Sequence, residues 1–114
     1  MNYSYEQTAS FKREFKRLNK KHKSLKFDLE TLKNEIENNP DLGVELGNGF
    51  RKLRLKITSK NKGKSGGARV ITSNVILNID HTKITFVYIW DKSETDNISD
   101  NFLSEIAKDE TSDQ

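Results

Sequence analysis

The spacing of apolar residues changes once along this 114-residue chain, and that change limits the possible folds more than any other feature. In the first third, two stripes repeat at positions i, i+4, i+7 and i+11, which is the period of an amphipathic helix. The first stripe consists of Phe11, Phe15, Leu18 and His22, and the second of Leu25, Leu29, Leu32 and Ile36. Pro40 ends the second helix, because the residue before a proline is disfavoured in the helical conformation. The sequence therefore predicts two antiparallel helices joined by a short link.

Beyond the glycines at positions 43, 47 and 49, apolar residues occupy every second position, as in a half-buried strand. Residues 52–57 place leucine and isoleucine on one side and Lys52, Arg54 and Lys56 on the other. Two more strands are predicted over residues 68–79 and 83–91, with a hairpin turn at Asp80-His81-Thr82 between them. Alternation at residues 1–6 predicts an edge strand, and residues 96–108 predict a short last helix.

These elements predict a small α+β domain. It comprises an N-terminal strand, a helical hairpin, a three-stranded antiparallel meander and a short C-terminal helix, with the helices packed on one face of the sheet. Residues 1–108 are expected to form this single domain. Residues 109–114 are expected to be an acidic, disordered tail.

Charge divides the chain into a basic body and an acidic end. Residues 1–93 contain 19 Lys or Arg and 10 Asp or Glu, whereas residues 94–114 contain one Lys and seven Asp or Glu. A basic body favours a polyanionic partner, because phosphate contacts release counterions. The alternative is a charged surface that only keeps the protein soluble.

Several chemistries are disfavoured by residues that the chain lacks. The absence of cysteine excludes disulfides, thiol nucleophiles and cysteine-ligated zinc. The two histidines, His22 and His81, have no ligand spacing, so we expect no metal and no cofactor. The longest apolar run, residues 86–90, is far shorter than a membrane span or a signal-peptide core. We therefore expect a cytoplasmic protein with no membrane partner.

Cations from three predicted strands are expected to lie close together. Arg69 begins the strand that follows the row of Lys52, Arg54 and Lys56, and Lys92 ends the last strand. Converging cations predict a phosphate site, because guanidinium and ammonium groups bind phosphate oxygens. A plain solvated sheet face is the alternative.

The glycine-rich loop at residues 59–67 contains Gly63-Lys64-Ser65, which is a fragment of a nucleotide-binding phosphate loop. The complete motif would need glycine at position 58, which is Thr58, and a helix after the loop. We therefore expect no nucleotide cofactor. The lysines of the loop, Lys60, Lys62 and Lys64, are still able to contact phosphate, or the loop is a simple surface connection.

An ordered set of segments resembles a known family. The set consists of Phe-Lys-Arg-Glu-Phe-Lys-Arg-Leu-Asn-Lys-Lys-His at 11–22, Asn39-Pro40 with Gly43, Lys-Leu-Arg-Leu at 52–55, Gly-Lys-Ser-Gly-Gly-Ala-Arg-Val-Ile at 63–71 and Tyr-Ile-Trp-Asp-Lys-Ser-Glu at 88–94. Over roughly residues 3–106 the chain is similar to the RelE/ParE superfamily of bacterial toxins, and most of all to its RelE/HigB-type branch.

The resemblance implies a metal-independent, ribosome-dependent endonuclease that cleaves mRNA at the codon in the ribosomal A site. It implies mRNA and ribosomal RNA as partners, together with a cognate antitoxin protein. By position in the family pattern, the catalytic residues would be Lys52, Arg54, Arg69 and Lys92. The residues expected to bind RNA are Lys56, Lys60, Lys62, Lys64, Lys16 and Lys20.

Two positions depart from the RelE pattern, since Ser93 stands in place of an arginine and Ser99 near the place of a tyrosine. Attack of a ribose 2′-OH on the adjacent phosphate needs a base, stabilisation of the phosphorane and an acid for the leaving oxygen. Arg54 and Arg69 suit charge stabilisation, Lys52 is the candidate base, and Lys92 anchors a phosphate or acts as the acid.

The two serines favour an alternative, a non-catalytic RNA- or protein-binding module of the same fold. A ParE-like, gyrase-directed toxin is a third possibility, against which the long basic loop argues.

Overall fold

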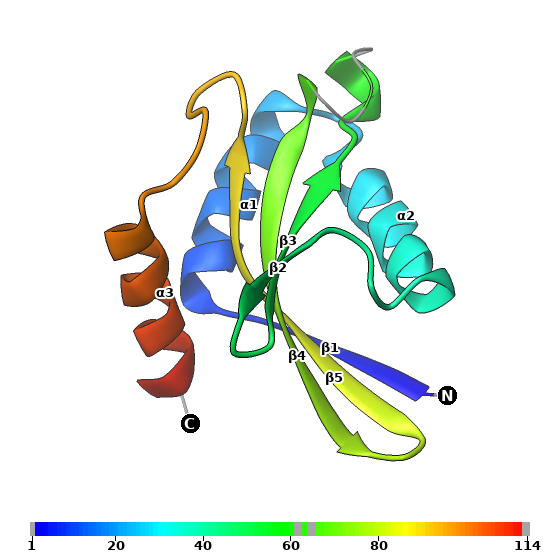
Figure 1. Cartoon of the computed structure of the whole chain (residues 1–114). Helices are drawn as coiled ribbons and strands as arrows, with labels where there is room; N and C mark the ends of the chain where they lie inside the picture. Colours follow the sequence, from blue (N-terminus) through cyan, green and yellow to red (C-terminus); the bar gives the residue numbers. More distant parts are fainter. Residues whose placement is uncertain (1, 61–62, 64–65, 113–114) are drawn as a thin grey trace.

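Five strands form one sheet in the order β1-β5-β4-β3-β2 in the computed structural model, which describes residues 2–60, 63 and 66–112 (Figure 1). The elements are β1 (Asn2–Gln7), α1 (Ala9–Lys21), α2 (Leu25–Asn38), β2 (Val44–Gly47), β3 (Phe50–Leu55), a 3-10 turn η1 (Thr58–Lys60), β4 (Ala68–Asn78), β5 (His81–Asp91) and α3 (Asp100–Ser112). β1 lies parallel to β5, and every other pair of neighbouring strands is antiparallel. The α+β class and the helical hairpin are therefore confirmed.

The two faces of the sheet carry separate cores. On one face, α1 and α2 pack their apolar stripes against β3, β4 and β5, burying residues such as Leu18, Leu32 and Val70. On the other face, α3 inserts Ile106 beside Ile71 and Trp90. The prediction that the helices pack on one face is thus wrong for α3, which covers part of the opposite face.

A β-bulge in β5 decides which of its residues reach each of the two cores. Ile71 of β4 pairs with Tyr88, but the next residue, Thr72, pairs with Phe86, so that Val87 is an extra residue in β5. The bulge changes which face the alternate side chains reach. Phe86 lies in the core under α1 and α2, whereas Val87 and Trp90 lie in the core under α3. This explains the unbroken apolar run of residues 86–90.

The sequence missed β2, so the predicted three-stranded meander is a four-stranded one. β2 has only four residues, all exposed, and its alternation of Val44 and Leu46 is too short to indicate a strand among the glycines around it. Backbone with positive φ at Gly43, Gly47, Asn48 and Gly49 brackets the strand and turns it back onto β3.

Three boundaries near the C-terminal half also differ from the prediction. β5 begins at His81, so the hairpin turn lies at residues 79–80. α3 begins at Asp100 because Ser99 caps it, with the Ser99 hydroxyl accepting a hydrogen bond from the Phe102 amide at 3.0 Å. α3 runs to Ser112, which places residues 109–112 of the expected tail in its last turn.

Thr8 joins the sheet to the first helix. Its backbone amide donates to the carbonyl of Phe86 at 3.0 Å, and its hydroxyl donates to the carbonyl of Val87 at 2.7 Å. The same hydroxyl accepts from the Phe11 amide at 3.1 Å and so caps α1. One buried side chain therefore fixes the start of α1 onto the bulge of β5.

Replacing Thr8 tests this junction. We expect Thr8→Ala to lower the free energy of unfolding by about 1–2 kcal/mol, because it removes a helix cap and leaves a buried carbonyl without its donor. Urea denaturation of Thr8→Ala and Thr8→Ser measures the effect. The serine variant keeps the hydroxyl and should lose clearly less stability; equal losses in the two variants would contradict the role of the hydroxyl.

Candidate functional site

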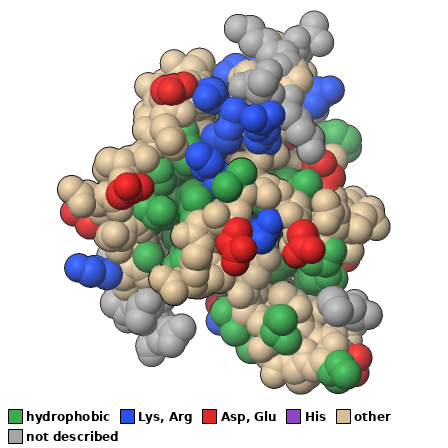
Figure 2. All heavy atoms as spheres, in the orientation of Figure 1, with side chains coloured by type: hydrophobic (Ala, Val, Ile, Leu, Met, Phe, Trp, Pro, Cys, Tyr) green, Lys and Arg blue, Asp and Glu red, His purple; other side chains and the backbone are tan. Residues whose placement is uncertain are grey.

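A hollow of about 460 Å³ on the sheet brings together all four residues that the resemblance assigns to catalysis. It is lined by Lys52, Arg54, Arg69, Lys92, Leu42, Gly43 and Val44. Figure 2 shows Lys and Arg side chains gathered on this face, with hydrophobic side chains beside them. The hollow is therefore rich in positive charge and has one apolar wall.

Strand register explains why these cations meet. Arg54 of β3 lies directly opposite Arg69 of β4, so both side chains point to the same face of the sheet. Lys52 is two residues before Arg54 on that face. Lys92 follows the end of β5, and its amide donates to the carbonyl of Gly67 at 3.1 Å, which holds it beside the start of β4.

Arg69 is the most buried of the four cations, with 7% of its surface exposed. Burial lowers the pKa of Arg69, and the neighbouring Arg54 lowers it further, whereas Asp96 acts in the opposite direction. Burial and the neighbouring Arg54 both make the charged form of the Arg69 guanidinium less favourable. An anion bound beside Arg54 and Arg69 would relieve this electrostatic cost, so the hollow is suited to a phosphate.

Asp91 anchors the end of β5 from the interior. Its carboxylate is fully buried and is paired with Lys60 Nζ at 2.8 Å and with His22 Nε2 at 2.9 Å. The amide and hydroxyl of Ser93 also donate to it, at 2.9 and 2.7 Å. Burial alone would raise the pKa of Asp91, but the hydrogen bonds from Lys60, Ser93 and His22 hold it well below its usual range. The adjacent Lys92 thus extends from a rigidly held strand end.

Glu94 fastens the segment after β5 to α1. Arg17 donates to its carboxylate through two nitrogens at 2.8 and 3.1 Å, and Lys21 donates at 3.2 Å. The hydrogen bond from Arg17 is the main reason why the pKa of Glu94 falls to about 2. At the edge of the hollow, Lys92 Nζ lies 3.0 Å from an exposed carboxylate oxygen of Asp96.

The wall formed by residues 42–44 was not predicted as part of the site. Gly43 approaches β3 so closely that a Cβ atom there would overlap with Leu53 Cδ2 and with the Lys52 carbonyl oxygen. The Arg51 guanidinium holds this segment, because it donates to the carbonyls of Asp41, Leu42 and Gly43. The positive φ of Gly43, +85°, also favours glycine, and a glycine after Asn39-Pro40 was the only sequence signal for this wall.

The residues expected to bind RNA do not all lie near the hollow. Lys56 is exposed just after β3, on the strand that carries Lys52 and Arg54. Lys16 and Lys20 are exposed on α1, which packs on the other face of the sheet. Lys62 and Lys64, with Ser65 of the phosphate-loop fragment, lie outside the described residues.

Lys60 differs from the loop lysine that the sequence predicted. It belongs to η1, its side chain is only 14% exposed, and its ammonium is paired with buried Asp91. The two serines that depart from the RelE pattern also have structural roles, since Ser93 donates to Asp91 and Ser99 caps α3. We therefore do not include Lys60 among the cations that face a ligand.

The described part of the chain has neither a cluster of metal-ligating side chains nor a membrane-spanning helix. No group of three His, Asp or Glu side chains there is arranged to hold a metal ion. No helix in that part is long and apolar enough to cross a membrane.

Fold and site together define a small basic α+β domain with a cationic hollow on its sheet. A family model described as the RelE toxin of the RelE/RelB toxin-antitoxin system matches residues 9–112. The chain therefore belongs to the RelE toxin family, which confirms the resemblance seen in the sequence. No curated protein matches the chain.

The ion pairs of Glu94 predict a pH-dependent stability. The pKa of Glu94 is about 2 in the folded chain, below its ordinary value of 4.5. The stabilisation that its ion pairs give the folded state is therefore fully present above pH 4.5 and is lost as the pH falls toward 2. The stability difference between the wild type and Glu94→Gln should therefore be largest near pH 6 and shrink below pH 4.5. Urea unfolding at pH 6, 4 and 3 measures it, and a difference that is constant with pH would contradict the pairing.

Proposed function

We propose that this RelE-family toxin is an endonuclease that cleaves mRNA in the A site of the ribosome. The observation that supports it is the meeting of Lys52, Arg54, Arg69 and Lys92 around one hollow. Four cations in one concave site are suited to a substrate whose every residue carries a phosphate. A ribosomal site of action also implies a cytoplasmic location.

Cleavage would break the bond between phosphorus and the 5′-oxygen of the next nucleotide. The ribose 2′-oxygen attacks the adjacent phosphorus, which yields a 2′,3′-cyclic phosphate and a free 5′-hydroxyl. Arg54 and Arg69 stabilise the phosphorane, since guanidinium groups stay ionised and bind two oxygens at once. Lys52 accepts the proton from the 2′-hydroxyl, and Lys92 supplies a proton to the leaving oxygen.

Contacts outside the hollow would hold the ribosomal RNA. We assign this role to Lys56, next to the hollow, and to Lys16 and Lys20 on the exposed face of α1. Lys62 and Lys64 complete the proposed set. The family name also leads us to propose a cognate antitoxin as a protein partner.

A specific observation favours a second candidate, a non-catalytic RNA-binding module of the same fold. None of the described residues that line the hollow carries a carboxylate, an imidazole or a phenol. General acid–base work would thus fall entirely on lysine. Such a module would bind ribosomes in a salt-sensitive way through the same cations without cutting RNA.

Cleavage of a short mRNA on programmed bacterial ribosomes, with mapped 5′ ends, distinguishes the two candidates. We expect the wild-type protein to cut within the A-site codon. Arg54→Ala and Arg69→Ala should each slow the reaction at least about 100-fold, because each variant lacks a positive charge that stabilises the phosphorane. Lys26→Ala is the control, since Lys26 is exposed on α2, which packs on the other face of the sheet and carries no residue of the proposed set.

The outcomes are separable. Full activity in both hollow variants would remove the site assignment, and binding without cuts would favour the non-catalytic module. Because Arg69 is buried, its variant is first checked for a native unfolding transition. A supercoiling assay with gyrase tests the ParE-like alternative on the same samples.

A further inference from the structure

The hairpin formed by β4 and β5 carries apolar side chains into solvent. Ile76 is 78% exposed and Ile79 is 89% exposed, and Val75 and Leu77 are exposed beside them. The hairpin extends beyond the helices together with β1 (Figure 1), and hydrophobic side chains appear on its surface in the lower part of Figure 2. An apolar strip of this kind marks an interaction surface when it is continuous with a cavity.

β4 also has an open edge at this hairpin. β3 pairs with β4 only from Ala68 to Ser73, and Gly49 accepts one more bond from the Asn74 amide at 3.0 Å. Among the described residues, no strand lies beside residues 75–78 on that side. An exposed apolar edge with free backbone groups is a template for an added strand.

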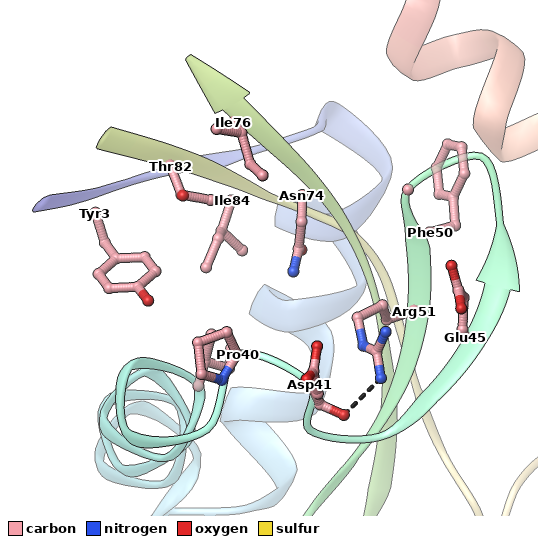
Figure 3. Close-up of a pocket in the computed structure, with 12 residues that line it drawn as sticks. Tyr3, Pro40, Asp41, Glu45, Phe50, Arg51, Asn74, Ile76, Thr82 and Ile84 are labelled. Carbon is pink, nitrogen blue, oxygen red and sulfur yellow. Dashed lines mark hydrogen bonds between the residues drawn. The ribbon is translucent and has the colours of Figure 1, made fainter. Parts of the chain in front are cut away.

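A cavity of about 290 Å³ lies at the foot of this edge, and Figure 3 shows it between the end of α2 and the hairpin. Tyr3, Ile36, Pro40, Ile76 and Ile84 contribute apolar walls. Asn74 lines it as well, and Figure 3 shows the nitrogen of its side-chain amide directed into the cavity. An amide nitrogen donates hydrogen bonds, so a partner in the cavity can supply an acceptor for it.

The rim of the cavity is acidic, although the chain as a whole has a net charge of +3. Asp41 and Glu45, both exposed, line it, and Figure 3 shows both around Arg51. Arg51 is committed to the backbone, because it donates to the carbonyls of residues 41–43. The rim therefore attracts a basic side chain.

We propose that the open edge of β4 and this cavity are the docking surface for an extended segment of the antitoxin. The segment adds as a strand beside residues 75–78 and inserts an aliphatic side chain into the cavity. It accepts a hydrogen bond from Asn74 Nδ2 and places Lys or Arg beside Asp41 and Glu45. A second copy of this chain is a poorer occupant, since a two-fold pairing would bring the same acidic rim against itself.

The docking surface is separate from the cationic hollow, because no residue lines both cavities. That the partner is an antitoxin rests on the proposed function. The protein encoded by the reading frame next to this chain's gene is the probe. Its affinity for the full chain is measured by calorimetry, and cleavage is assayed on the same variants.

Two charge-changing variants test the surface. Ile76→Lys should weaken binding of the probe at least about tenfold, because it places a charge in an apolar contact. Phe27→Lys is its matched control, since Phe27 is 67% exposed on α2. Glu45→Lys should weaken binding of the probe as well. Its matched control, Glu105→Lys at an exposed position of α3, should not weaken binding. Hydrogen exchange should show new protection of the amides of residues 75–78 in the complex.

Unchanged affinity for Ile76→Lys together with unprotected amides at residues 75–78 would overturn the proposal. A dimer of the free chain that Ile76→Lys dissociates would overturn it in favour of a second copy. Cleavage with no binding of the probe would also overturn the docking proposal and leave the proposed function intact. Binding that depends on Ile76 and Glu45 without any cleavage would support the docking surface while the nuclease assignment fails.

Discussion

The buried carboxylate of Asp91 is the contact on which the arrangement of the site depends. A buried charge is tolerated only when cations and hydrogen bonds surround it, and four donor groups from three separate segments do so here. They come from His22 at the end of α1, from Lys60 in η1 and from Ser93 after β5. The carboxylate thus ties the end of α1 and η1 to the end of β5, next to Lys92, which lines the hollow.

Local periodicity predicted much of the fold. The two apolar stripes gave the helical hairpin, and the alternation at residues 52–57 gave β3 with its cationic face. The sequence could not reveal the bulge at Val87, because an extra residue within a run that is apolar on both sides leaves the pattern unchanged. The bulge decides which residues of β5 face α3. β2 was missed because a four-residue exposed strand is held by pairing and by Arg51 rather than by burial.

The sequence predicted those features of the site that depend on the alternation of side chains along a single strand. Lys52 and Arg54 follow from β3 alone, whereas the position of Arg69 opposite Arg54 depends on the register between strands. The role of Lys60 could not be predicted from the composition of its segment. A lysine in a polar, glycine-rich segment indicates a solvated loop, but Lys60 pairs with a buried carboxylate 31 residues away. Ser93 and Ser99 appeared as losses from a family pattern, yet each hydroxyl makes a hydrogen bond that shapes the segment after β5.

Residues 41–45 separate two cavities of opposite character. Asp41 and Glu45 line the apolar cavity beside the hairpin, while Leu42, Gly43 and Val44 line the cationic hollow. One segment presents different residues to the two sides because Arg51 holds three of its carbonyls and Gly43 lets it lie directly against β3. The basic charge of the chain is therefore not spread evenly over its surface. The cationic side of this segment is suited to a polyanion and the acidic, apolar side to a basic, apolar chain, so the two proposed partners would have separate places on one small sheet.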